Sequence, residues 1–162
     1  AAIADDDGNP HFKNATYFMD KREYDYWLDD YNDDEAYELM LRKLVAIKDN
    51  LQLTEGDTEI LEGVRLIATP GHTLHHISVE FESDGEILLC PIDVMDHQLQ
   101  GKHPTWGANW DLDRSASIES RKKILQRASD SQALVQGFHF PFPGLGHFTV
   151  DGDNWQWQTL EE

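Results

Sequence analysis

The chain has 162 residues, 40% of them apolar, which is typical of one globular domain with a hydrophobic core. Its formal net charge of -18, from 31 acidic and 13 basic residues, opposes binding to nucleic acid and to anionic membrane surfaces. A single cysteine, Cys90, excludes an internal disulfide framework, and no apolar stretch is long enough for a membrane span. We therefore expect a single domain over residues 1–162, located in the cytoplasm, with no nucleic acid and no membrane as partner.

The first part of the chain is predicted to begin with a short strand at 15–19 and an aromatic-rich helix at 21–28. A clearer helix follows from Asp33, with acidic residues at its start and Lys48 near its end, as the helix dipole favours. Its apolar positions recur at helical spacing. They are Tyr37, Met40, Leu41, Leu44 and Val45.

The middle of the chain is predicted to form strands. Segments 58–61 and 64–69 flank Glu62-Gly63, and segment 76–90 alternates on both sides of Asp84-Gly85, a strong hairpin signal. In the first strand of this hairpin, His76, Ser78 and Glu80 should face away from the core. Ile77, Val79 and Phe81 should face it.

The last third is predicted to combine a loop, a helix and a hairpin. Residues 95–113 lack periodicity and indicate an ordered surface loop, and a helix should begin at Ser117. A strand at 133–138 and a closing hairpin, turning at 151–152 or 152–153, complete the chain. This mixture of strands and helices predicts a layered αβ sandwich.

Histidines and one aspartate gather at one end of the central hairpin. Counted outward from its turn, Asp93 falls opposite His76, and His97 falls opposite His72, if both strands continue without a bulge. His139 ends an apolar strand before a loop rich in proline and glycine. Imidazole and carboxylate without cysteine form a nitrogen and oxygen ligand set, for which zinc is the first choice.

The ordered motifs "TPGHT" with His72, Asp93 after a hydrophobic strand, and "HFPFPGLGH" with His139 resemble the C-terminal part of metallo-β-lactamase-fold hydrolases. The lactonase-like and organophosphate-hydrolase-like branch is the most similar. The resemblance runs from about residue 7 to the chain end. It implies an αβ/βα four-layer sandwich, incomplete at its N-terminus, with the chain as the C-terminal portion of the domain.

The resemblance also implies a site with two divalent metal ions, taken as zinc. In that scheme His72 binds the first ion, Asp93 bridges both and acts in catalysis, and His139 binds the second. A hydroxide between the ions would attack an ester, a lactone or a related bond of a small-molecule substrate. His76 would support the ligand loop. From the loop 95–113, His97 and Trp106 are candidates for contact with the site or the substrate.

The chain departs from the family pattern in three places. His75 and Ile92 stand where the family usually has glycine, and no "HxHxDH" motif occurs. The missing motif suggests a truncated gene product, a proteolytic piece or a natural metal-poor relative, of which the first two are favoured. A missing segment would leave sheet surface uncovered, so we expect a homo-oligomer or association with the missing N-terminal part. The alternative function is a non-catalytic binding or scaffold domain.

Overall fold

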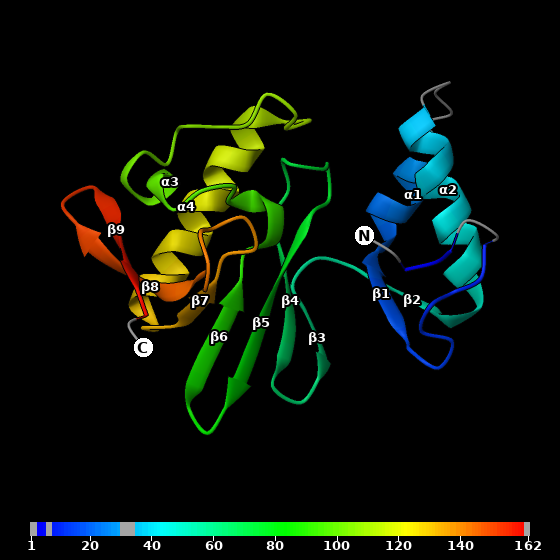
Figure 1. Cartoon of the computed structure of the whole chain (residues 1–162), viewed down its shortest axis with the longest axis horizontal. Helices are drawn as coiled ribbons and strands as arrows, with labels where there is room; N and C mark the ends of the chain where they lie inside the picture. Colours follow the sequence, from blue (N-terminus) through cyan, green and yellow to red (C-terminus); the bar gives the residue numbers. More distant parts are fainter. Residues whose placement is uncertain (1–2, 6–7, 30–34, 161–162) are drawn as a thin grey trace. The chain divides into compact units, whose positions relative to one another are not determined.

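The computed structural model describes residues 3–5, 8–29 and 35–160, which form two compact units, Ala1–Glu55 and Gly56–Glu162 (Figure 1). Among these described residues, no helix is long and apolar enough to cross a membrane. The expectation of one domain over residues 1–162 stays a prediction.

The first unit contains two helices and a two-stranded parallel sheet, in which β1 pairs with β2. Its elements are β1 (Tyr17–Asp20), α1 (Lys21–Asp29), α2 (Glu35–Ile47), the 3-10 helix η1 (Lys48–Asn50) and β2 (Leu51–Thr54). The predicted start of α2 at Asp33 and the side chain of Tyr37 lie outside the described residues. Leu44 and Ile47 are buried, whereas Val45, one of the apolar positions at helical spacing, is 54% exposed. The strand β2 was not predicted.

The second unit is built on a seven-stranded sheet in the order β3-β4-β5-β6-β7-β8-β9. All neighbouring strands are antiparallel except β6 and β7, which are parallel and joined through the helix α4. The elements are β3 (Thr58–Leu61), β4 (Val64–Ala68), β5 (Ile77–Ser83), β6 (Glu86–Cys90), η2 (Ile92–Val94), α3 (Leu99–Lys102), α4 (Arg114–Asp130), β7 (Leu134–Gln136), β8 (Leu145–Asp151) and β9 (Asn154–Thr159).

Two hairpin turns lie where the sequence predicts them. Asp84 and Gly85 have φ of 53° and 83°, which is the pattern of a two-residue turn with left-handed backbone at both positions. The predicted register therefore holds as far as the pair Val79 and Cys90. In the last hairpin, Asp151 pairs with Asn154, so the turn is Gly152-Asp153.

The helix α4 contributes to the core of this unit. Asp113 caps its N-terminus by accepting a hydrogen bond from the Ala116 amide at 3.0 Å, so the helix begins three residues before the predicted Ser117. Its buried residues are Ser117, Ser120, Arg121, Ile124, Leu125 and Ala128. Ile124, Leu125 and Ala128 pack with residues of the sheet, among them Leu89, Val135 and Phe148. The predicted loop 95–113 is confirmed apart from the short helix α3.

The predicted orientation of β5 was wrong. Ser78 and Glu80 are 0% and 5% exposed, whereas Phe81, which should have been in the core, is 41% exposed. The polar face turns inward because α4 supplies a partner, since Arg127 donates hydrogen bonds to both carboxylate oxygens of Glu80 at 2.5 and 2.6 Å. This ion pair raises the pKa of Arg127.

Candidate active site

The three predicted metal ligands lie in one hollow of the second unit. It measures about 550 Å³ and is lined by His72, Asp93, Asp96, Trp110 and His139. His72 follows the Pro70-Gly71 turn after β4, and His139 lies beyond β7. Gly71 is required at this turn, because a Cβ there would lie 2.1 Å from the backbone nitrogen of Ser117.

Asp93 lies between the two imidazoles and presents a different oxygen to each. Its Oδ1 is 2.9 Å from His139 Nε2, and its Oδ2 is 3.7 Å from His72 Nε2. The preceding residue, Ile92, has φ of 58°, so it adopts the left-handed backbone that glycine usually provides. The departure from the family pattern therefore leaves a strained residue next to the carboxylate, as is common at functional sites.

A chain of buried hydrogen bonds orients the imidazole of His76, which in turn contacts the backbone of Asp93. The Ser78 hydroxyl donates to the carbonyl of Pro91 at 2.9 Å, and it lies 3.0 Å from the Thr69 hydroxyl, which lies 2.9 Å from His76 Nδ1. With the Ser78 proton committed to Pro91, Thr69 donates to Ser78 and accepts from His76 Nδ1–H. His76 Nε2 is then free of hydrogen and accepts from the Asp93 amide, 3.3 Å away.

The predicted strand pairing around these residues does not continue. The strand β6 ends at Cys90 and turns into η2, so Asp93 meets His76 through its backbone amide rather than as a strand partner. The expected pairing of His97 with His72 was wrong for the same reason. His97 instead accepts a hydrogen bond from the amide of Leu99 at the start of α3, at 3.1 Å.

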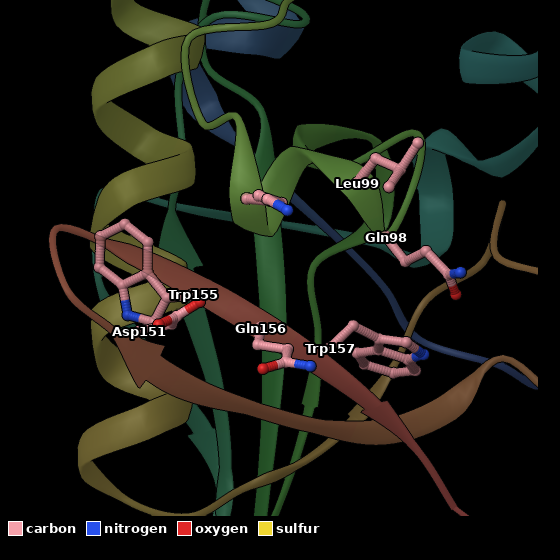
Figure 2. A pocket seen from close by; sticks show the side chains of 7 residues that line it. Gln98, Leu99, Asp151, Trp155, Gln156 and Trp157 are labelled. Atoms are coloured by element: carbon pink, nitrogen blue, oxygen red, sulfur yellow. The ribbon is translucent and has the colours of Figure 1, made fainter.

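The aromatic residues near the site make different contacts from one another. Trp106 stacks on His103 with ring centroids 4.1 Å apart, and Trp110 lines the hollow. The ring of Phe138 meets His139 edge-on at 5.0 Å, whereas Phe140 belongs to the core. A different hollow, of about 240 Å³, lies beside α3 and β9, where Trp155 and Trp157 line it with Gln98 and Leu99 (Figure 2). Its lining includes none of the predicted ligands.

Arg121 organises the loop around the site, a role that the sequence analysis missed. Its side chain is 0% exposed and donates to the carbonyls of Val94 at 2.9 Å, Pro104 at 2.9 Å and Trp106 at 2.8 Å, and to the Ser117 hydroxyl at 3.2 Å. Burial lowers the pKa of Arg121, while the charges of Asp111 and Asp96 oppose this effect. An arginine between helical apolar positions was the only sequence signal.

Known proteins share this arrangement of elements. The solved structure of AidC, a dizinc quorum-quenching lactonase in complex with a product, matches with a TM-score of 0.87 and 26% identity. The match covers 99% of this chain and 60% of AidC. The hydrolase AbOPH of the beta-lactamase superfamily matches with a TM-score of 0.81 and 26% identity over 96% of this chain and 58% of its own. The chain therefore has the metallo-β-lactamase fold.

Sequence comparison points to the same branch of the metallo-β-lactamase fold. The N-acyl homoserine lactonase AiiA of Bacillus thuringiensis subsp. kurstaki is 34% identical over 124 residues, which cover 74% of this chain and 46% of AiiA. No protein-family profile matches the chain. The chain spans about half the length of the curated relatives it matches. The predicted fold class and the resemblance to lactonase-like hydrolases are confirmed.

The donor set of the hollow fits part of a zinc site. Two imidazole nitrogens face a carboxylate without any cysteine, which is a common zinc ligand chemistry. Within residues 3–5, 8–29 and 35–160, however, no group of three or more His, Cys, Asp or Glu side chains is arranged to hold an ion. His139 Nε2 and Asp93 Oδ1, the atoms through which these residues would bind a metal, are hydrogen-bonded to each other instead.

Proposed function

We propose that the protein containing this chain is a zinc-dependent lactonase, and that this chain supplies His72, Asp93 and His139 as metal ligands. The observation that carries the proposal is the position of Asp93, whose two oxygens face two different imidazoles at 2.9 and 3.7 Å. A carboxylate placed between two imidazoles in this way could help to hold two ions, through one oxygen or through both. When bound, two zinc ions would polarise the lactone carbonyl and lower the pKa of a water molecule.

The residues of this chain have distinct roles in this proposal. His72 and His139 each direct Nε2 toward Asp93, and His76 fixes the backbone of Asp93 by accepting its amide hydrogen. Trp110, 66% exposed at the rim, would contact an apolar acyl chain. The relatives named as N-acyl homoserine lactonases suggest such a substrate.

The experiment compares the full-length gene product with the 162-residue chain. Zinc content is measured by mass spectrometry, and hydrolysis of N-hexanoyl homoserine lactone is followed by proton release, with a p-nitrophenyl ester and a phosphotriester as competing substrates. We expect the full-length protein to hydrolyse the lactone, a chelator to abolish this activity, and added zinc to restore it. The chain alone should bind zinc more weakly. A full-length protein that folds without zinc and without hydrolysis would support the scaffold function instead.

We also propose that the second unit associates through the sheet face opposite the α4 core, with a second copy or with a part of the protein outside this chain. Register places Val64, Phe81, Leu88 and Leu134 on this face. They line a hollow of about 540 Å³, in which Phe81 is 41% exposed. Exposed apolar sheet surface of this kind favours association.

A Phe81→Ser variant should weaken self-association of the 162-residue chain about 10-fold or more, because burying a phenylalanine contributes about 1.5–3 kcal/mol. Sedimentation across a concentration series measures this change. The control is Val150→Ser, which alters a residue that is 60% exposed and absent from this hollow. A wild-type chain that stays monomeric at every concentration would contradict the homo-oligomer.

A further inference from the structure

The fold does not explain why the carboxylate of Asp111 is buried. Its side chain is 0% exposed, and neither of its oxygens has a hydrogen-bond partner. A buried charge without hydrogen bonds is costly, so each such group in a folded protein calls for an explanation. It lies in the loop before α4, next to the imidazole of His72, one of the predicted metal ligands.

Two groups lie close to this carboxylate. Its Oδ1 is 3.4 Å from His72 Nδ1, and its Oδ2 is 4.0 Å from a terminal nitrogen of Arg121. All but one of the guanidinium hydrogens of Arg121 are donated to three carbonyls and a hydroxyl. The nitrogen with the remaining hydrogen lies 4.0 Å from Oδ2, beyond hydrogen-bond distance, so the guanidinium balances the charge of Asp111 without bonding to it. The nearest available donor is therefore the imidazole of His72, whose Nδ1 is itself buried and without a hydrogen bond.

The backbone holds these two side chains beside each other. The amide of Leu112 donates to the carbonyl of His72 at 3.2 Å, and the amide of Asp113 donates to the carbonyl of Gly71 at 2.9 Å. The two residues that follow Asp111 are thus hydrogen-bonded to His72 and to the glycine before it. A shift of a few tenths of an ångström would bring Oδ1 and Nδ1 within ordinary hydrogen-bond distance.

We propose that Asp111 is the positioning residue for His72: it accepts the Nδ1 hydrogen and leaves the Nε2 lone pair directed at Asp93. Its importance for metal binding rests on the proposed function, because metal-binding histidines commonly donate their second ring nitrogen to a carboxylate that fixes the tautomer. The hydrogen bond itself does not depend on a metal. A purely structural counterion for Arg121 would have no effect on the His72 tautomer.

The test is the tautomer of His72, read from long-range nitrogen-15 NMR spectra of the metal-free 162-residue chain well above the usual histidine pKa. In the wild type we expect hydrogen on Nδ1. In Asp111→Leu this signature should be lost. Because removing one partner of a buried pair can unfold the protein, the same spectrum is recorded for the double variant with Arg121→Met, in which both charges are replaced by apolar groups. The control is Asp153→Asn at the exposed last turn.

The outcomes separate this proposal from the proposed function. Hydrogen on Nε2 in the wild type, or an unchanged Nδ1 signature in the double variant, would overturn the role of Asp111. In the full-length protein, Asp111→Leu should weaken zinc binding about 10–100-fold in competition with a chelator, while Asp153→Asn should not. If the tautomer changed but the zinc affinity did not, the role of Asp111 in metal binding would be wrong, although its hydrogen bond to His72 would stand. If the wild-type full-length protein bound no zinc, only the proposed lactonase function would be rejected.

Discussion

Arg121→Met is expected to destabilise the 162-residue chain by about 3–5 kcal/mol, the usual cost of removing one partner of a buried charge pair. Without the guanidinium, the carbonyls of Val94, Pro104 and Trp106 lose their donor, and Asp111 loses the cation 4.0 Å away. No water can replace these bonds without opening the loop, since the side chain is fully buried. Urea unfolding followed by circular dichroism measures the change in the free energy of unfolding.

Two further variants separate this effect from the loss of a helix charge. Lys122→Met changes the next residue, which makes an exposed ion pair with Glu119 at 2.9 Å, and should alter stability by less than about 0.5 kcal/mol. Arg121→Lys keeps the charge but not the planar set of donors, so its stability should fall between the other two. Equal stability of Arg121→Met and Lys122→Met would refute this account of the loop.

Asp93→Ala is expected to lower lactone hydrolysis by the full-length protein by at least about 100-fold, more than the loss of an outer partner of a metal ligand. The reason is that Asp93 faces both His72 and His139, so its removal should also lower the zinc content. Hydrolysis rates and bound zinc are measured on the same samples.

The control for Asp93→Ala is Asp153→Asn, which removes a negative charge from an exposed turn. It should retain zinc and activity. If Asp93→Ala kept both at the wild-type level, the proposed role of Asp93 would be wrong.

The sequence predicted the strands and turns better than it predicted which side of a strand is buried. Gly85 and Gly152 mark the two hairpins because their positions need left-handed backbone. The faces of β5 could not be read from alternation, because Glu80 is buried by an ion pair with Arg127, a residue 47 positions away. Because the opposite face carries Ile77, Val79 and Phe81, the alternation pointed to that face as the interior.

The site was predicted only in part for a related reason. His72, Asp93 and His139 are recognised by their motifs, and they lie in one hollow, but their role as ligands stays a prediction. Asp111 and Arg121 carry no motif. Their significance depends on burial and on bonds to backbone carbonyls, which appear only once the loop is folded against α4.

The one parallel pair of the large sheet explains how residues 46 positions apart come to share a hydrogen bond. Because β6 and β7 run in the same direction, the chain leaves both strands at the same end of the sheet, first toward Asp93 and later toward His139. With antiparallel strands here, those two exits would lie at opposite ends of the sheet. The polarity of two short strands thus decides whether a carboxylate and an imidazole can meet at all.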